Sequence, residues 1–383
     1  MIPLSTDDLP WFFEDGDRAL AARLRAAAPA IAASEDAADE DARDRAAVAA
    51  LGEAGLFALV APADGVVRAR SLCLARELLG WASARADSIF AVQGLGTYAV
   101  LAAGDAAQRA MVPDLAAGRT VAAFGLTEPE AGSDVAAIAT RAVADGAGYR
   151  LTGEKMFISN LGLASFATVV ATVDPALGRK GLTAFWVPLD APGVTVIRQQ
   201  PIAPHPLGRL ILDGARATRI GEVGAGFGLA MRTLDSFRVS VAAAAVGMAR
   251  RALDEAARHV RARVQFGKPL ADQPLVQAHL ADMATQIDSA RLMTLRAAAV
   301  KDAGARGTVE VSMAKLHATE AAQDVIDRAV QLLGGRGVMA GAVVEHLYRA
   351  VRPLRIYEGT SEIQRTIIGR AIATASLTGG GAA

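Results

Sequence analysis

A carboxylate near the C-terminal end of the chain is the first candidate for chemistry. Glu358 follows Tyr357 and precedes Gly359, at the point where a helical pattern begins. Thr360 or Ser361 is a plausible cap for that helix, because a hydroxyl can accept from the backbone N–H groups of a first turn. A carboxylate at such a junction, beside an apolar neighbour, can have a raised pKa and act as a general base. The alternative is one more charged residue at a helix start.

A polar turn nearer the middle of the chain offers a place for a ligand. The segment FGLTEPEAGSDVAAIAT, residues 124–140, runs from a short apolar strand into hydroxyls and backbone amides at a Pro/Gly turn. Such a turn can cradle an anionic or heteroaromatic ligand; an ordinary polar turn is the alternative. The segment GEKMFISN, residues 153–160, adds Phe157 and Ser159. These two point to the same face of a regular strand, because side chains alternate.

Two further segments combine a polar side chain with glycines. In RVQFGKPLADQPLVQ, residues 263–277, Arg263 stands three residues before Phe266, and Gly267 closes the turn. A guanidinium placed in this way could bind phosphate; a solvated helix end is the alternative. The segment QLLGGRG, residues 331–337, places Gln331 before a glycine pair. Each of these segments is ambiguous when taken alone.

Several other classes of protein are excluded or disfavoured. The pattern G-x-G-x-x-A at 94–99 is followed by no β-α-β unit, so close helix packing is the better interpretation. No two of the five histidines lie three or four residues apart, which predicts no metal site. A single cysteine excludes a disulfide framework and suits a reducing compartment. With 40 basic and 40 acidic side chains, the chain lacks the excess positive charge of a nucleic-acid binder.

The elements that must position these residues follow the order helices, strands, helices. Alanine-rich helical segments fill most of 14–120, β-branched and aromatic runs separated by turns fill 121–222, and helical spacing returns from about 226. The predicted domains are 1–120 (helical), 121–222 (small β domain) and 223–383 (helical bundle). No basic, apolar leader opens the chain, and the longest apolar stretches are too short for a bilayer. We therefore expect a cytoplasmic protein without a membrane span.

Taken together, four motifs make the chain resemble the acyl-CoA dehydrogenases, from roughly 15 to 372. They are T-E-P-x-A-G-S-D, Q-F-G-K, Q-x-L-G-G-x-G and Y-E-G-T-S-E-I-Q, in this order. The resemblance implies an α+β, mainly α, fold: an N-terminal helical domain, a central small β-barrel or sheet domain and a C-terminal four-helix bundle. It also implies FAD between the β domain and the bundle, and a homo-oligomer, usually a tetramer, in which a neighbouring subunit completes each flavin site.

The resemblance also implies roles for individual residues. Glu358 would be the catalytic base, taking the α proton of an acyl-CoA while hydride passes from the β carbon to flavin N5, which yields a trans-2-enoyl-CoA. The thioester would contact Ser133, Asp235, Arg238, Tyr357 and Gly359. FAD would contact residues from all four motifs: Phe124, Leu126, Thr127, Gly132, Ser133, Phe157, Ser159, Arg263, Phe266, Gln331, Gly335, Thr360 and Glu362. Of these, Arg263, Phe266, Gln331 and Gly335 would serve the FAD of the partner subunit.

The sequence departs from the family pattern at several positions. A strand-like run follows Gly208 at once, where the family usually has a polar loop, and 214–221 is also short. Pro274 stands where a flavin-contacting Gln is common, and Phe237 replaces a smaller polar residue. The usual Y-G-G after Pro62 is absent. These changes concern the acyl pocket, the carrier of the acyl group and the subunit contacts.

Three alternatives therefore stay open beside an acyl-CoA dehydrogenase of lipid metabolism that passes electrons to an electron-transfer flavoprotein or a similar acceptor. The first is a dehydrogenase of a substrate tethered to an acyl carrier protein in a biosynthetic pathway. The second is a flavin oxidase or monooxygenase on the same fold, which the retention of Glu358 disfavours. The third is a non-catalytic protein that keeps FAD for stability.

Overall fold

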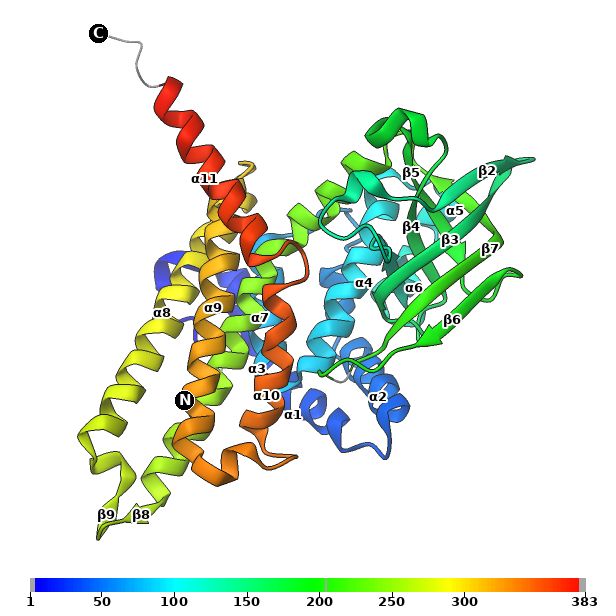
Figure 1. Cartoon of the computed structure of the whole chain (residues 1–383). Coiled ribbons are helices and arrows are strands. Elements are labelled where there is room, and N and C mark those ends of the chain that lie inside the picture. The colour runs from blue at the N-terminus through cyan, green and yellow to red at the C-terminus, as the bar shows by residue number, and fades with distance from the viewer. Residues whose placement is uncertain (1–3, 204, 379–383) are drawn as a thin grey trace. The chain divides into compact units, whose positions relative to one another are not determined.

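The computed structural model describes residues 4–203 and 205–378, which form two compact units. The helical unit comprises the described residues of 1–28, 69–84 and 238–383. The strand-containing unit comprises those of 29–68 and 85–237. The predicted fold class, mainly helical with a small β domain, is confirmed (Figure 1). The seven strands of the large sheet lie between 122 and 220, while the predicted boundaries of three domains stay a prediction.

The sheet of the strand-containing unit closes on itself. Its order is β1-β4-β2-β3-β7-β5, and β4 also pairs with β5, so that five strands complete a circuit. β1 and β2 run parallel to β4, β6 adds to β7, and the other pairings are antiparallel. The strands are β1 (Ala122–Gly125), β2 (Arg141–Asp145), β3 (Gly148–Ser159), β4 (Phe166–Thr172), β5 (Leu182–Pro188), β6 (Val194–Arg198) and β7 (Leu207–Ile220). Since β7 begins at Leu207, the strand does follow without an intervening loop.

The helices of this unit include α2 (Glu40–Glu53), α4 (Ala84–Ala103), α5 (Ala106–Arg109) and α6 (Val112–Ala116). Of these, α4 and α6 share an apolar core with strands of the sheet. A Cβ at Gly96 would lie 2.7 Å from both the Ala122 Cβ and the Ala123 carbonyl oxygen, so only glycine lets α4 approach β1 this closely. The Thr168 hydroxyl donates to the Gly96 carbonyl at 2.7 Å and fixes the contact. The G-x-G pattern at 94–96 is therefore a helix-packing feature, as predicted.

The helical unit owes its tight packing to small residues. It contains α3 (Ala69–Ala82), α8 (Pro274–Asp302), α9 (Thr308–Leu333), α10 (Val343–Val351) and α11 (Ser361–Thr378), with parts of α1 (Asp15–Ala33) and α7 (Gly226–Ala262). α8 and α9 lie side by side (Figure 1). A Cβ at Gly80 would lie 2.4 Å from the Ala244 carbonyl oxygen, and one at Gly247 would lie 2.0 Å from that of Glu77. Glycine and alanine at these positions thus let the α3 and α7 backbones touch.

A hairpin of two short strands joins α7 to α8. β8 (Val264–Gln265) and β9 (Lys268–Pro269) are linked by Phe266 and Gly267. Both turn residues have left-handed backbones, with φ of 53° and 78°, as in the two-residue turns that match the strand twist. The turn leaves the Phe266 side chain 95% exposed.

One helix among the described residues, α4, is long and apolar enough to cross a membrane by composition alone. Two thirds of its apolar window, 67%, is buried in the fold. Core helices of globular proteins often satisfy the same criterion, so this is weak evidence for a span.

Candidate active site

The turn that carries Glu358 is held by three donors. Glu358 has a left-handed backbone, with φ of 53°, and Gly359 follows with φ of 92°. Arg238 Nε on α7 donates to the Glu358 carbonyl at 2.9 Å. Lys315 Nζ on α9 donates to the Gly359 carbonyl at 2.7 Å, and Gln364 Nε2 on α11 donates to the same oxygen at 2.9 Å. Three helices of one unit therefore fix the two peptide groups beside the predicted base.

Lys315 is fully buried beneath this turn. Burial lowers its pKa to about 8, because a charged ammonium loses hydration there. The carboxylates of Glu358, Glu320 and Glu362 oppose this shift, while Arg238 adds to it. The lysine is thus a buried cation whose charge is supported mainly by the acidic side chains around the turn.

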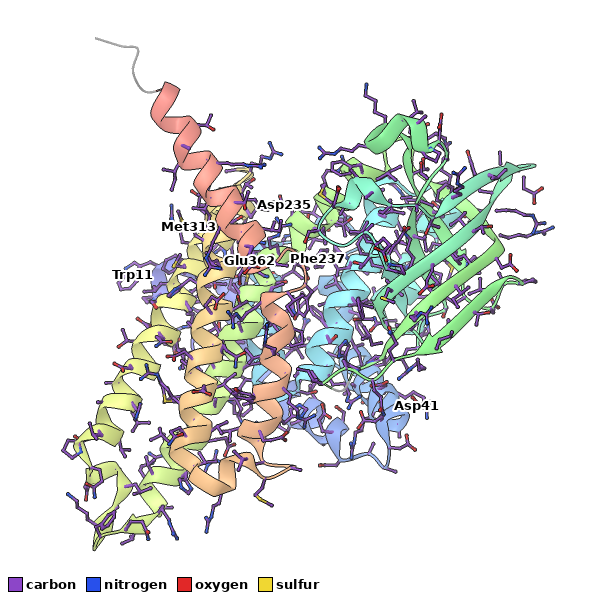
Figure 2. The ribbon with its side chains drawn as sticks, in the orientation of Figure 1. Trp11, Asp41, Asp235, Phe237, Met313 and Glu362 are labelled. Carbon is purple, nitrogen blue, oxygen red and sulfur yellow. The ribbon has the colours of Figure 1, made fainter. Side chains whose placement is uncertain are left out.

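Glu320 on α9 anchors both flanks of the same turn. Its carboxylate contacts Arg355 Nη2 at 2.6 Å before the turn, and accepts from the Ser361 hydroxyl at 2.7 Å after it. Thr360 is the cap of α11, since its hydroxyl accepts from the Ile363 N–H at 3.3 Å. Figure 2 shows Glu362 at the first turn of α11, and its side chain is exposed.

A buried ion pair in the strand-containing unit shapes the polar turn after β1. Lys155 on β3 is fully buried; its Nζ donates to the Glu128 carboxylate at 2.7 Å and to the Leu126 carbonyl at 3.1 Å. Glu128 also accepts from the N–H groups of Ala139 and Thr140, at 2.7 and 3.0 Å. Burial raises the pKa of Glu128, but Lys155 and these donors outweigh it, and the pKa is lowered overall. The turn is therefore tied to β3 on one side and to the 139–140 backbone on the other.

Strand β3 is irregular at the predicted ligand-facing residues. Its pairing with β7 shifts between Lys155 and Ile158, and Phe157 has a left-handed backbone with φ of 58°. Lys155 and Ile158, three residues apart, are both buried. A bulge therefore interrupts the period of two between Lys155 and Ile158, while the shared face of Phe157 and Ser159 stays a prediction. The Phe157 ring is 61% exposed.

Ser159 is bonded to a histidine. Its hydroxyl lies 3.3 Å from His205 Nε2, and His205 Nδ1 lies 2.8 Å from the Ala203 carbonyl. A carbonyl can only accept, so Nδ1 carries the proton and the neutral ring accepts the Ser159 hydroxyl hydrogen at Nε2. Burial lowers the pKa of His205, which favours this neutral form. The oxygen of Ser159 is then left with its lone pairs for another partner.

The hairpin end of the helical unit gathers positive charge and exposed apolar surface. Arg263 and Arg336 both lower the pKa of His259, after the effect of burial, so the three groups are electrostatic neighbours. Phe266 stands exposed at the hairpin tip. Gln331 lies sixteen residues beyond Lys315 on α9, roughly 24 Å along the helix axis at 1.5 Å per residue. We call Arg263, Phe266, Gln331, Gly335 and Arg336 the hairpin cluster. The structure does not bring this cluster together with Glu358 of the same chain.

The predicted site residues divide between the two units. Those in the strand-containing unit are Phe124, Leu126, Thr127, Gly132, Ser133, Phe157, Ser159 and Asp235. Those in the helical unit are Arg238, Arg263, Phe266, Gln331, Gly335, Tyr357, Glu358, Gly359, Thr360 and Glu362. The structure brings Arg238, Glu358 and Gly359 together. Arg238, a predicted substrate contact, donates from Nε to the backbone carbonyl of Glu358, the predicted base.

Sequence reasoning missed the side chains that support these turns, namely Glu128, Lys155, His205, Lys315 and Gln364. A signal for Lys315 did exist. It lies on the face of α9 that also carries the buried Val311, Ala318 and Ala322. A lysine on an apolar helix face needs a partner inside the protein. Among the described residues, no group of three or more His, Cys, Asp or Glu side chains could hold a metal ion.

Two family models match the chain. They are the acyl-CoA dehydrogenase middle domain, over residues 123–215, and the acyl-CoA dehydrogenase C-terminal domain, over 224–373. The first matched region contains the T-E-P-x-A-G-S-D motif, and the second contains the other three motifs of the resemblance.

Named relatives extend the likeness. The chain is 42% identical to the mitochondrial short-chain specific acyl-CoA dehydrogenase of Homo sapiens over 267 residues, which are 68% of this chain and 65% of that protein, just under two thirds of its length. It is 37% identical to the cyclohexane-1-carbonyl-CoA dehydrogenase of Geobacter metallireducens over 338 residues, which are 84% of this chain and 87% of that protein.

Solved structures share the fold. Butyryl-CoA dehydrogenase from Megasphaera elsdenii superposes with a TM-score of 0.86 at 30% identity, covering 94% of this chain and 99% of that one. A glutaryl-CoA dehydrogenase of Mycobacterium smegmatis in complex with FADH2 gives 0.86 at 27% identity, covering 97% and 98%. The prolyl acyl carrier protein oxidase AnaB gives 0.83 at 25% identity, covering 94% and 99%.

Proposed function

The chain belongs to the acyl-CoA dehydrogenase family, and from that premise we propose that it dehydrogenates the α,β bond of an acyl thioester, with acyl-CoA as substrate, Glu358 as base and FAD as cofactor. Named relatives are acyl-CoA dehydrogenases, which are oxidoreductases acting on CH–CH donors. The observation that carries the proposal is the Glu358 turn. The carboxylate stands on a left-handed residue, and the carbonyls of Glu358 and Gly359 accept hydrogen bonds from three side chains.

The residues of the predicted cofactor site offer groups that suit FAD. In the strand-containing unit, Phe157 is an exposed aromatic ring, which can stack on a flat heterocycle. Ser159 keeps its lone pairs for a donor, and the exposed Gly132 and Ser133 leave backbone amides accessible at the polar turn. A Cβ at Gly132 would meet nothing within 4 Å, so nothing in the chain fills that position.

The hairpin cluster of the helical unit, Arg263, Phe266, Gln331, Gly335 and Arg336, supplies the complementary groups. Two guanidiniums suit a pyrophosphate, and a fully exposed phenylalanine suits a purine. We propose that this cluster serves the FAD of a partner subunit, as the family resemblance implies, within a homotetramer. The 95% exposure of Phe266 supports the proposal only in leaving the ring accessible to a partner subunit.

The chemistry assigned to the chain itself is proton transfer and alignment. Glu358 takes the α proton of the thioester at its carboxylate, while bound FAD supplies the acceptor for the hydride from the β carbon. We propose that the Glu358 backbone N–H donates to the thioester oxygen, as the family resemblance implies. A fixed N–H at that oxygen stabilises the enolate-like charge as the proton leaves.

The test is anaerobic bleaching of the flavin. Purified protein loaded with FAD is mixed with short, medium, branched, aromatic and dicarboxylic acyl-CoAs, and the loss of the yellow oxidised band is followed. At least one saturated acyl-CoA should bleach the flavin and yield its 2-enoyl product. Bound FAD that no thioester of any class reduces would instead indicate a non-catalytic flavoprotein.

A second candidate function is the dehydrogenation of a substrate that is tethered to an acyl carrier protein. An oxidase that acts on such a tethered substrate is a variant of it. It is supported by the fold likeness to the prolyl acyl carrier protein oxidase. Phe237, one of the departures from the family pattern, is a fully buried ring on α7 that packs edge-on against Tyr98. Carrier-protein thioesters belong in the bleaching screen. Fast reoxidation of the product-bound reduced flavin by O2 would favour the oxidase.

The electron acceptor in the proposal comes from the family resemblance, and the cytoplasmic location comes from the sequence. The reduced enzyme passes electrons to an electron-transfer flavoprotein or a similar acceptor, and the protein works in the cytoplasm. Dye-linked and flavoprotein-linked turnover, measured side by side, tests the acceptor.

A further inference from the structure

We propose that Lys315 is a positioning residue for the general base, and that its ammonium group locks the Glu358–Gly359 turn in the reactive conformation and releases it when the proton is lost. The proposal rests on the proposed function, because it assigns Glu358 the role of base. It concerns the support of that base rather than the proton transfer itself.

The backbone geometry creates the need for such a lock. A left-handed conformation is unfavourable for glutamate, and it persists only where the surroundings determine it. Here Glu358 at φ 53° is followed by Gly359 at φ 92°. The restraints are hydrogen bonds from α7, α9 and α11 to the carbonyl oxygens of Glu358 and Gly359, which belong to the two peptide groups after Glu358. Losing one donor frees part of that peptide and, with it, the direction of the Glu358 carboxylate.

Of the three donors, Lys315 alone changes charge in the working range of an enzyme. The guanidinium of Arg238 stays protonated and the Gln364 amide is neutral at every ordinary pH. Lys315 is fully buried, and burial lowers its pKa to about 8. The charged groups that face it are Glu358 on the turn, Arg238 on α7, Glu320 on α9 and Glu362 on α11. Proton loss would leave a neutral amine at the Gly359 carbonyl and remove a cation beside the base.

The experiment compares Lys315→Met, which removes the donor, with Lys315→Arg, which carries a charge that is not lost below pH 12. Ser312→Ala is the matched control: Ser312 is buried three residues earlier on α9, and its hydroxyl has no hydrogen-bond partner among the described residues. The rate of flavin reduction at saturating acyl-CoA is measured from pH 6 to 9.5, together with FAD content and thermal midpoint.

We expect the wild-type rate to fall as pH rises through about 8. Lys315→Met should reduce flavin at least about tenfold more slowly at pH 7, because the base is misplaced, and its rate should lack the alkaline fall. Lys315→Arg should reduce flavin faster than Lys315→Met and hold its rate to pH 9.5. Equal rates and the same alkaline fall in wild type and Lys315→Met would overturn the proposal.

A second readout does not depend on catalysis. Amide hydrogen exchange of the peptide covering 355–364 is measured at several pH values and corrected for the intrinsic pH dependence. Protection should decrease above about pH 8 in wild type and be reduced at every pH in Lys315→Met, while Ser312→Ala matches wild type. Unchanged protection in Lys315→Met would refute the lock. If no thioester reduces the flavin, the proposed function fails, yet this measurement still decides whether Lys315 holds the turn.

Discussion

The ammonium of Lys155 lies 2.7 Å from the carboxylate of Glu128, and both side chains are buried beneath the turn that follows β1. The pair joins a loop to the middle of β3, and its remaining bonds go to backbone groups of the same loop. A buried ion pair of this kind organises a turn without facing the solvent. The polar turn and the Glu358 turn are supported in the same way. In each, a buried lysine donates hydrogen bonds to the turn that carries the predicted ligand contacts.

Breaking the Glu128–Lys155 pair on one side should strongly destabilise the protein. Lys155→Met leaves a buried carboxylate without its cation, and the expected loss is about 3–5 kcal/mol in the free energy of unfolding. The double variant Glu128→Gln/Lys155→Met should lose less, because no uncompensated charge stays buried. Urea denaturation of the wild type, both single variants and the double variant measures the coupling. Additive losses would contradict a direct pair.

The same pair predicts a pH dependence of stability. The pKa of Glu128 in the folded protein is below its ordinary value of 4.5, so its contribution is complete above that value and is lost as pH falls through the folded pKa. The free energy of unfolding should therefore decline below about pH 4.5, and Glu128→Gln should flatten part of that slope. Burial of the Lys155 charge lowers the free energy of unfolding at every pH below about 8. This loss of stability disappears as pH rises from about 8 toward 10.5, because the folded protein then holds the lysine neutral. Denaturation from pH 3 to 7 tests the acid part.

Replacing the base should separate binding from chemistry. Glu358→Gln should retain FAD and thioester binding but slow flavin reduction by at least about a hundredfold, within the range of a positioned general base. Glu53→Gln, at an exposed position at the end of α2, is the control. Stopped-flow absorbance reports the rate. Wild-type-like reduction in Glu358→Gln would remove Glu358 from the mechanism.

The glycine after the base should be irreplaceable. Gly359 has φ of 92°, and a Cβ there would lie 2.6 Å from Gln364 Nε2. Gly359→Ala should cost about 1–3 kcal/mol as a strained backbone and displace the Gln364 donor. Gly369→Ala, in the interior of α11 with nothing within 4 Å of the added Cβ, is the control and should be neutral or stabilising. Thermal unfolding and flavin reduction rates compare the two; equal effects would argue that the turn tolerates a side chain.

The hairpin cluster should control cofactor retention. Arg263→Ala should lower the FAD content after dialysis, and more so at high salt, because a phosphate contact is partly screened. Arg261→Ala, an exposed arginine two residues earlier whose Nε bonds the Ala257 carbonyl, is the control. FAD absorbance per chain and the sedimentation coefficient are measured together. A fully loaded Arg263→Ala protein would exclude the phosphate role.

Local patterns determined much of this protein. Alanine-rich periodicity predicted the helices, β-branched runs separated by turns predicted the strands, and the four motifs predicted the family. These features are local, because helix propensity, strand alternation and turn residues act between near neighbours in the chain. The cap at Thr360 was predictable for the same reason.

Only the tertiary structure decided how the predicted residues are supported. Arg238 meets the Glu358 carbonyl across 120 residues, and Lys315 meets Gly359 across 44. The bulge at Phe157 depends on the register of β3 against β7, which the alternation within one strand does not specify. Burial of a lysine is favourable only where distant segments supply its acceptors and counter-charges. That condition belongs to the folded chain as a whole, since the hydrogen-bond acceptors of the Lys155 and Lys315 ammonium groups lie 27 to 44 residues away in the sequence.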